Sequence, residues 1–285
     1  MKYIIIDSMS LCYRAKYAMK GVNLSNPDSG AYTEVVYNFC NQILFIANKF
    51  GCSNFIFCWD SGKYFRKNIY PTYKQKKKAL TKDEKLFSRI THPQFSEIRR
   101  KLLPALGFKN IFIQTGMEAD DVIASIVFKN KSTDFVIVST DEDLFQLLRS
   151  NILHYSPVKK VGTNLSKFKT NYGIEPNLWS DVKSIAGCVS DNVKGVDGVG
   201  EKTAIKYIKG EVTSGKRFDD IKKNPDLIKF NKQLVTLPYK GTNVFPIRPE
   251  QLYISNFIKT FNRYKFESFL TQNRLKQWEL SFNLK

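Results

Sequence analysis

Met-Glu-Ala-Asp-Asp-Val-Ile-Ala-Ser-Ile-Val-Phe occupies residues 117–128, and Asp-Phe-Val-Ile-Val-Ser-Thr-Asp-Glu-Asp-Leu follows at residues 134–144. Apolar residues recur at helical spacing in the first part, and a short β-branched run from Phe135 to Val138 marks the second. The pattern predicts a helix followed by a buried strand, as in an α/β fold. One acidic cluster begins the helix, and another follows the strand.

The two acidic clusters are expected to converge. Glu118, Asp120 and Asp121 lie in the first turn of the predicted helix, and Asp141 and Asp143 lie just past the predicted strand. Both places belong to the carboxyl edge of a parallel sheet, where such folds carry their sites. Packed carboxylates repel one another unless a cation lies between them, and oxygen-only ligands suit Mg²⁺ or Mn²⁺. A simpler interpretation, in which the acids stabilise and cap helix starts, fits either cluster alone.

Further aspartates favour the metal-binding interpretation. Tyr3–Ile6 reads as a buried strand that ends in Asp7, and Phe55–Trp59 reads as a strand that ends in Asp60. A long helix is predicted over residues 35–47, between the two strands. Acids that follow several strands are harder to explain as helix caps.

The composition indicates a folded protein that binds a polyanion. The 285 residues are 42% hydrophobic, enough for one large domain or one domain with a substantial appendage. Lys and Arg number 45 against 26 Asp and Glu, and the formal charge of +19 exceeds what solubility needs. Five cysteines without a C-x-x-C pair indicate neither a disulfide framework nor a zinc site. We expect a cytoplasmic protein, because Asp7 comes too early for a signal peptide and no segment is long enough to span a bilayer.

A basic stretch follows Asp60. Residues 63–85 have no apolar face long enough to bury, and their lysines alternate with aromatic residues, namely Tyr64, Phe65, Tyr70 and Tyr73. A solvated charged segment is one interpretation. The other is a contact with single-stranded nucleic acid, because bases stack on aromatic rings while ammonium groups neutralise phosphates.

The next part of the chain carries weaker signals. Pro93 is predicted to open a helix, and strands are predicted over Phe108–Ile113 and Ile152–Tyr155. His92 and His154 are the two histidines, and neither has a neighbouring pattern that indicates a metal or catalytic role.

From Ser166 the pattern becomes mainly helical. Residues 195–203, Gly-Val-Asp-Gly-Val-Gly-Glu-Lys-Thr, nearly match a phosphate-binding P-loop, but a glutamate intrudes and no strand precedes them. We interpret them as a glycine hairpin between two short helices, in which Gly198 and Gly200 let backbone amides face a phosphate. Lys202 would add charge there. A plain helix–turn–helix packing corner is the alternative.

Three blocks of the sequence resemble a known family. They are Glu-Ala-Asp-Asp-Val-Ile (118–123), Ser-Thr-Asp-Glu-Asp (139–143) and Ser-Asp-Asn-Val-Lys-Gly-Val-Asp-Gly-Val-Gly-Glu-Lys-Thr-Ala (190–204). They resemble the signature blocks of the 5′-nucleases, which comprise flap endonucleases, phage 5′-exonucleases and the 5′-nuclease domain of bacterial DNA polymerase I. The blocks stand in the family's order, and the likeness runs from Asp7 to about Lys209.

The resemblance implies an α/β fold in two parts. The first part, residues 1–165, would be a parallel-sheet, PIN-like nuclease core with a helical arch at residues 63–92. The second, residues 166–285, would be mainly helical, with a helix-hairpin-helix arm that grips duplex DNA and C-terminal helices that pack on the core. No polymerase domain follows, so the chain resembles the free-standing, phage-type nuclease, which would act in the host cytoplasm if it is phage-encoded.

The resemblance also implies the residues of the site. The metal-site carboxylates would be Asp7, Asp60, Glu118, Asp120, Asp121, Asp141, Asp143 and Asp191. They would hold two divalent cations, Mg²⁺ or Mn²⁺, and the catalytic residues would be Lys74, Asp141 and Asp143. The DNA contacts would be Arg66, Tyr73, Lys74, Lys77, Gly198, Gly200 and Lys202. In the family, the hairpin also binds a potassium ion through backbone carbonyls.

The implied function is metal-dependent phosphodiester hydrolysis near the 5′ end of a strand at single-strand/duplex junctions, as in primer removal during DNA replication or repair. The partners would be DNA with a 5′ flap or an RNA–DNA hybrid, and we expect a monomer. Two alternatives stay open. One is a DNA-binding replication or recombination factor that has lost turnover, and the other is a nuclease that degrades single-stranded RNA.

One residue departs from the family's pattern. The family carries Gly-Asp-x-x-Asp-Asn before the hairpin, whereas this chain has Cys188 in place of the first aspartate. A thiol is soft and largely protonated near neutral pH, so it is a poor ligand for Mg²⁺. We therefore expect a second metal site that holds Mg²⁺ weakly or accepts Mn²⁺ more readily. The alternative is that Cys188 is a small buried residue and that Asp143 and Asp191 suffice.

Overall fold

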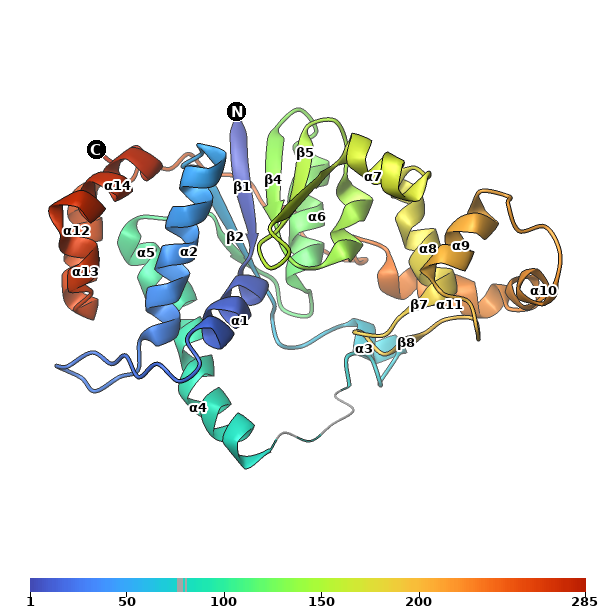
Figure 1. Cartoon of the computed structure of the whole chain (residues 1–285), viewed down its shortest axis with the longest axis horizontal. Coiled ribbons are helices and arrows are strands. Elements are labelled where there is room, and N and C mark those ends of the chain that lie inside the picture. Colours follow the sequence, from blue (N-terminus) through green and yellow to red (C-terminus); the bar gives the residue numbers. More distant parts are fainter. Residues whose placement is uncertain (76–78, 80) are drawn as a thin grey trace. The chain divides into compact units, whose positions relative to one another are not determined.

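The computed structural model describes residues 1–75, 79 and 81–285 (Figure 1). By their internal contacts these residues divide into two compact units. Unit 1 comprises Met1–Trp59, Lys78–Phe112 and Pro246–Lys285, and unit 2 comprises Asp60–Lys77 and Ile113–Phe245. Most of the predicted site residues therefore belong to unit 2. The domain boundary predicted at residue 165 stays a prediction.

Unit 1 contains parallel strands covered by helices. Its strands are β1 (Lys2–Asp7), β2 (Phe55–Trp59) and, ending at the unit boundary, β3 (Ile111–Ile113). β1 and β2 run parallel, with Ile4 opposite Phe55 and Asp7 opposite Cys58. Its helices are α1 (Ser8–Ala18), α2 (Glu34–Phe50), α4 (Lys82–Glu97), α5 (Leu103–Leu106), α12 (Ile254–Tyr264), α13 (Glu267–Leu270) and α14 (Gln272–Phe282). The first two predicted strands and the long helix between them are confirmed.

The C-terminal helices belong to the core of unit 1. In Figure 1, α12 to α14 lie beside α2 and α5. The ring of Phe282 lies 5.3 Å from that of Phe55 and 5.9 Å from that of Phe108, centroid to centroid. Phe257 and Trp278 are fully buried behind it. These contacts belong to unit 1, and the predicted packing of residues 166–285 on a core of residues 1–165 stays a prediction.

Two predictions in the middle of the chain are wrong in detail. Pro93 lies inside α4 instead of opening a helix, because a capping box between Thr81 and Glu84 starts the helix earlier. The helix then runs through a π-helical turn, η1 (Ile98–Leu102), into α5. The strand predicted from residue 108 begins only at residue 111, since the amides of residues 109 and 110 donate to Glu250 instead.

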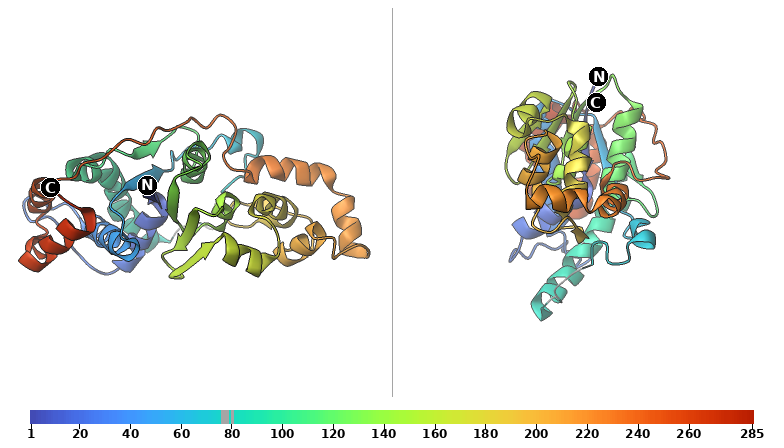
Figure 2. Two further views of the ribbon diagram at one scale, coloured as in Figure 1. Left: turned by 90° about the horizontal axis from the view of Figure 1, so that it is seen from above. Right: turned by 90° about the vertical axis from the view of Figure 1, so that its right-hand side faces the viewer.

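Unit 2 continues the α/β pattern and adds an arm of helices (Figure 2). Its strands are β4 (Asp134–Val138), β5 (Ile152–Ser156), β6 (Val161–Asn164), β7 (Gly187–Cys188) and β8 (Val193–Lys194). β4 and β5 are parallel, and β6 is antiparallel to β5. Its helices are α3 (Arg66–Ile69), α6 (Ala119–Lys129), α7 (Leu165–Tyr172), α8 (Trp179–Ala186), α9 (Glu201–Ile208), α10 (Lys216–Lys222) and α11 (Pro225–Val235), with 3₁₀ turns η2 (Glu142–Leu147) and η3 (Pro176–Leu178). The predicted α/β class with mostly parallel strands is confirmed.

The connection from α8 to α9 is a tight hairpin, in which β7 pairs antiparallel with β8. Gly195 packs so closely on the end of α8 that a Cβ atom there would lie 2.2 Å from the Ala186 carbonyl. The structure thus has two short helices joined by a glycine-containing hairpin, as the sequence predicts. Across the described part of the chain, no helix combines the length and apolar character that a membrane crossing requires.

Candidate metal centre

The first acidic cluster forms at the start of α6. Glu118 is the N-cap residue, and its carboxylate and that of Asp121 each accept a hydrogen bond from the other's backbone amide. Asp120 lies in the same turn, and ligand oxygens of all three residues lie within 4.8 Å of one another. The local capping role is therefore real, and the three carboxylates still converge.

The second cluster forms where η2 meets the hairpin of unit 2. Asp141 is the N-cap of η2, and its Oδ1 accepts a hydrogen bond from the Asp143 amide at 2.8 Å. Ligand atoms of Asp143, Cys188 and Asp191 lie within 4.8 Å of one another. The Sγ atom of Cys188 lies 3.9 Å from Asp143 Oδ2. Residues distant in sequence thus meet here, and the metal roles that the resemblance implies for Asp141, Asp143 and Asp191 stay predictions.

Tyr73 and Lys74 bridge the two clusters. The Tyr73 hydroxyl lies 2.8 Å from Glu118 Oε2 and 3.1 Å from Asp191 Oδ2. The Lys74 ammonium contacts Glu118 Oε1 and lies 3.6 Å from Asp191 Oδ1. Burial alone would lower the pKa of Lys74, but Glu118 and Asp191 raise it above its ordinary value, so the side chain stays charged.

The segment that carries these two residues is fastened to the Asp191–Asn192 turn. The Lys74 amide donates to the Asp191 carbonyl at 2.8 Å, and the Tyr70 hydroxyl donates to the Asn192 carbonyl at 3.0 Å. The Asn192 side chain donates in return to the Thr72 carbonyl at 2.9 Å. These bonds hold Lys74 in a left-handed conformation, with φ of 50°, which costs a non-glycine residue about 1–2 kcal/mol. Strain of this kind is concentrated at functional sites.

Arg66 lies within the first cluster instead of on the surface. Its side chain is 2% exposed, and its guanidinium donates to both oxygens of Asp121 at 2.5 and 2.8 Å. The same group donates to Glu118 Oε2 at 3.1 Å and, through Nε, to the Leu234 carbonyl at 2.7 Å. The structure thus makes Arg66 the counter-ion of Asp121. The DNA contact that the resemblance implies for Arg66 stays a prediction.

Asp121 is fully engaged within the protein. Besides Arg66, its oxygens accept hydrogen bonds from the Tyr239 amide at 2.7 Å and the Glu118 amide at 3.2 Å. A metal ion would have to displace some of these donors, so the metal role of Asp121 stays a prediction. Asp120 is half-buried, and its Oδ1 accepts a hydrogen bond from the Asp121 amide at 2.7 Å.

Three carboxylates of the site, those of Asp120, Asp141 and Asp143, have raised pKa values. Burial, with Asp143 adding to it, raises the pKa of Asp141 to about 7. Burial and the neighbouring acids raise the pKa of Asp120 well above its ordinary value. Burial also raises the pKa of Asp143, against the opposing effect of Lys183. Such a cluster is stabilised by a bound cation, which removes the repulsion that favours the protons.

Two further predicted carboxylates, Asp7 and Asp60, lie at the ends of strands β1 and β2 and belong to different units. Asp60 Oδ1 accepts a hydrogen bond from the Ala119 amide at 2.7 Å, which places Asp60 next to the first cluster. Asp7 belongs to unit 1, where it is the N-cap of α1 and accepts from the Ser10 amide at 3.0 Å. The metal roles of Asp7 and Asp60 stay predictions.

The remaining predicted residues concern DNA. Gly198 lies in the hairpin with φ of 71°, and Gly200 is the N-cap of α9. Lys202 is exposed in the first turn of that helix. Lys77 lies outside the described residues. The DNA contacts of all these residues stay predictions.

Sequence analysis missed Lys183. Its Nζ lies 3.2 Å from Asp143 Oδ1 and 2.7 Å from Glu201 Oε1. Burial alone would lower the pKa of Lys183, but Asp143 and Glu201 raise it above its ordinary value. A signal was present, because helical spacing places Lys183 on the buried face of α8 with Trp179 and Val182, where an apolar residue is expected.

The two clusters fit a divalent metal ion unequally. The first offers only carboxylate oxygens, which suit Mg²⁺ or Mn²⁺. In the second, burial and Asp143 raise the pKa of Cys188 to about 12, so the thiol stays protonated at neutral pH. Cys188 also packs in an apolar cluster with Tyr73, Val193, Leu234 and Val235. The packing supports the interpretation of Cys188 as a small buried residue, while its chemistry predicts weak binding of Mg²⁺.

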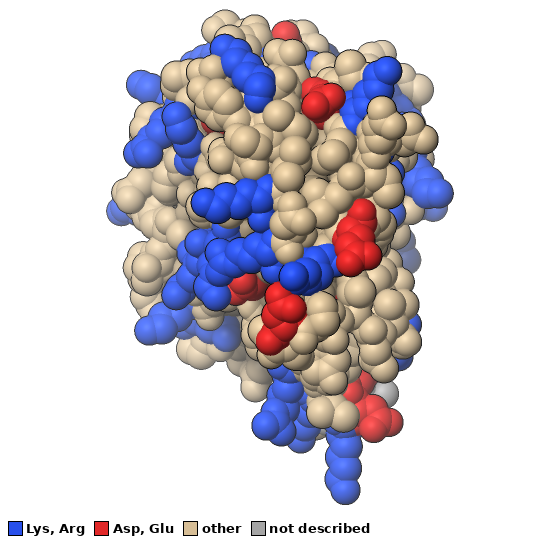
Figure 3. Space-filling model, turned by 90° about the vertical axis from the view of Figure 1, so that its left-hand side faces the viewer, with Lys and Arg blue, Asp and Glu red and all other residues tan. Residues whose placement is uncertain are grey.

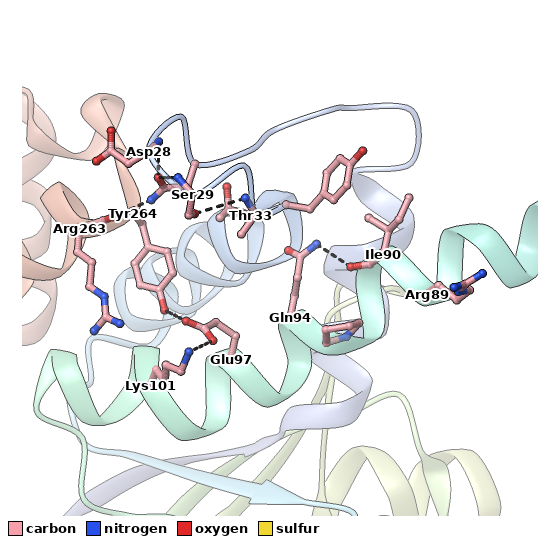
Figure 4. A pocket seen from close by; sticks show the side chains of 14 residues that line it. Asp28, Ser29, Thr33, Arg89, Ile90, Gln94, Glu97, Lys101, Arg263 and Tyr264 are labelled. Carbon is pink, nitrogen blue, oxygen red and sulfur yellow. Dashed lines mark hydrogen bonds and ion pairs between the residues drawn. The ribbon is translucent and has the colours of Figure 1, made fainter.

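A pocket elsewhere in unit 1 lacks the predicted site residues. Figure 4 shows this pocket, of about 790 Å³, between the loop before α2, the helix α4 with the turn that follows, and α12. Its one half-buried carboxylate, Glu97, accepts a hydrogen bond from Tyr264 at 2.8 Å and forms an ion pair with Lys101 at 2.9 Å. A carboxylate already paired in this way gives no reason to prefer the pocket over the acidic clusters.

Comparison with known sequences gives consistent results. The family described as "5′-3′ exonuclease, N-terminal resolvase-like domain" matches residues 2–173. A 5′-3′ exonuclease of Buchnera aphidicola subsp. Schizaphis graminum is 31% identical over 263 residues, which cover 90% of this chain and 82% of the relative. DNA polymerase I of Caldicellulosiruptor bescii is 33% identical over 243 residues, or 80% of this chain. The chain spans only 26% of that polymerase's length.

Comparison with solved structures shows the same fold. A flap endonuclease of bacteriophage T5, solved with DNA and metal ions, superposes with a TM-score of 0.72 at 18% identity. The match covers 99% of both chains. At this identity the likeness is one of fold.

Proposed function

Since the chain belongs to the family of 5′-3′ exonucleases, we propose that it is a metal-dependent nuclease that hydrolyses phosphodiesters near the 5′ end of a strand at single-strand/duplex junctions. The observation that carries this proposal is the meeting of the two acidic clusters across Tyr73 and Lys74. Because four separate segments of the sequence supply these groups, a common task explains their convergence better than separate helix caps do.

Each group has a defined place in this proposal. Glu118, Asp120 and Asp141 would hold one divalent ion, and Asp143 and Asp191 would hold a second, weaker one. When bound, such ions activate water and stabilise the leaving oxygen. Lys74 would offset the negative charge that develops on the scissile phosphate. Tyr73 keeps Glu118 and Asp191 in place by its hydroxyl.

Surface charge supports DNA as the substrate. The formal charge is +19, and Figure 3 shows Lys and Arg side chains spread over the face that it presents, with fewer Asp and Glu side chains among them. A basic surface binds the phosphate backbone without regard to sequence. The helical arch, the potassium ion at the hairpin, the monomeric state and the cytoplasmic location stay predictions.

One comparison of substrates tests the proposal. Purified protein is incubated with 5′-flap DNA and, separately, with unstructured RNA of the same length, each with Mg²⁺, Mn²⁺ or a chelator. We expect metal-dependent cleavage of the flap DNA and little cleavage of the RNA. The double variant Asp141→Asn/Asp143→Asn controls for contaminating nucleases. Flap binding without cleavage would favour a DNA-binding factor that has lost turnover, and preferred cleavage of RNA would favour a single-strand ribonuclease.

Lys202→Ala is expected to weaken binding of duplex DNA and to reduce the salt slope of binding by about one, because one phosphate contact is lost. Lys202 is exposed in the first turn of α9, where the helix also favours an anion. Binding is measured by fluorescence anisotropy over a series of salt concentrations. Lys129→Ala, an exposed lysine at the end of α6, is the control. An unchanged salt slope in the Lys202 variant would place that side chain away from the DNA.

Cys188→Asp is expected to raise the rate of cleavage at limiting Mg²⁺. It should also narrow the difference between the rates of cleavage with Mg²⁺ and with Mn²⁺. The substitution supplies a carboxylate next to Asp143, where the wild-type thiol stays protonated. Initial rates are measured across a titration of each metal, with Cys52→Asp, at a buried thiol in unit 1, as the control. Identical titrations for wild type and Cys188→Asp would show that the thiol does not limit metal binding.

A further inference from the structure

The second cluster already contains a cation. Lys183 is 10% exposed, and its ammonium lies 3.2 Å from Asp143 Oδ1, one of the three ligand groups of that cluster. The ring of Trp179 lies 5.4 Å from the ammonium and fixes the side chain from within the same helix. Lys183 is thus placed by the core of α8, unlike an exposed lysine that reaches the site by chance.

The charges of the two clusters are balanced differently. In the second cluster, the carboxylates of Asp143 and Asp191 are each approached by a lysine, Lys183 at 3.2 Å and Lys74 at 3.6 Å. In the first cluster, three carboxylates share Arg66 and the same Lys74. An ion that binds Asp143 must therefore compete with the Lys183 ammonium, which already offsets part of the repulsion at the second cluster.

Lys183 has a second partner, Glu201, which can retain the ammonium if Asp143 binds an ion instead. Its Nζ also lies 2.7 Å from Oε1 of Glu201, the first residue of α9, whose side chain is 44% exposed. An ion that binds Asp143 would repel the ammonium, and Glu201 would retain it. The lysine can thus leave Asp143 without becoming an unpaired buried charge, which would be strongly unfavourable.

We propose that Lys183 is the resident counter-ion of Asp143 and takes the place of a second tightly bound divalent ion. The chain then binds one divalent ion tightly, at Glu118, Asp120 and Asp141, and a second one only when Lys183 leaves Asp143 and stays paired with Glu201. Lys183 is a positioning residue in this arrangement, and it sets the number of ions bound. The proposal rests on the proposed function only in that the clusters bind divalent ions.

The test counts bound ions without DNA and without turnover. Mn²⁺ is titrated into the purified full chain, and free Mn²⁺ is measured by electron paramagnetic resonance. For the wild type we expect one tight ion and a second bound about 10- to 100-fold more weakly, the range by which residues beside metal ligands alter affinity. Lys183→Met should tighten the second ion by a similar factor, whereas Lys183→Arg, which keeps the charge, should leave it weak.

Lys232→Met is the matched control, because Lys232 also pairs with an aspartate of α8, at 2.5 Å from Asp181, but lies outside the cluster. It should bind Mn²⁺ as the wild type does. Two equally tight ions in the wild type, or identical titrations for Lys183→Met and Lys232→Met, would overturn the proposal. If Lys183→Met does not fold, Lys183→Gln provides the same comparison. Because no cleavage is measured, a failure of the proposed nuclease activity would leave this result standing, and the reverse also holds.

Discussion

Lys74→Ala is expected to slow cleavage of a 5′-flap substrate by about 10²- to 10³-fold, the loss that follows removal of one group that stabilises charge in a transition state. DNA binding should weaken only modestly, because a charge used in the transition state costs rate more than ground-state affinity. The structure places the Lys74 ammonium against Glu118 and 3.6 Å from Asp191, in contact with both clusters. Single-turnover rates at saturating protein and the affinity for uncleaved substrate in Ca²⁺ separate the two effects.

The control for this variant is Lys63→Ala, an exposed lysine of the same basic stretch. Its removal should affect binding slightly and leave the single-turnover rate near that of the wild type. Equal losses of rate and affinity in Lys74→Ala would mean that Lys74 contacts DNA only in the ground state. A stability measurement on Lys74→Ala checks that the segment stays in place, since its anchoring bonds are made by the backbone and by Tyr70 and Asn192.

Arg66→Met is expected to lower the free energy of unfolding by about 3–5 kcal/mol, because it leaves buried carboxylates without their counter-ion. Asp121 is fully buried and loses two charge-assisted bonds, and the Leu234 carbonyl loses its donor as well. Chemical denaturation in the presence of a chelator measures the effect without a contribution from bound metal. The double variant Arg66→Met/Asp121→Leu should recover part of the loss, since it removes both buried charges together.

The matched control is again Lys232→Met, whose pair with Asp181 is one-third exposed on the lysine side. Pairs as exposed as this contribute about 0–1 kcal/mol, so the control should unfold almost as the wild type does. An Arg66→Met variant as stable as the control would show that Asp121 is neutralised in another way. Arg66 would then be available for the DNA contact that the family resemblance implies.

Local sequence patterns predicted those helices and strands whose buried face is defined by their own residues. The apolar period of residues 122–127 and the β-branched run at residues 135–138 gave α6 and β4, because both elements bury the face that their own sequence defines. The start of α4 was missed because a capping box at Thr81 outweighs the usual preference of Pro93 for a first helical turn. The acids that end β4 and begin α6 were found because each cluster is local in sequence.

The partners of those acids were not predictable in the same way. By sequence, Arg66 resembles the many basic residues around it, and only the fold shows that its side chain is buried against Asp121. Lys183 interrupts the apolar face of α8. The residue with which it pairs, Asp143, lies on a different element. Counter-ions of buried carboxylates come from distant segments, so their identity depends on tertiary structure that no local pattern carries.

The hydrogen bonds between residues 70–74 and the Asp191–Asn192 turn can form only after that turn has left the ribosome. Tyr73 and Asp191 are 118 residues apart in sequence. Tyr73 and the adjacent Lys74 therefore leave the exit tunnel long before the turn that holds them. At about 5–20 residues per second, the delay is about 6–24 s. During that interval the nascent chain has no anchored Lys74, and it is therefore expected not to cleave nucleic acid near the site of its synthesis.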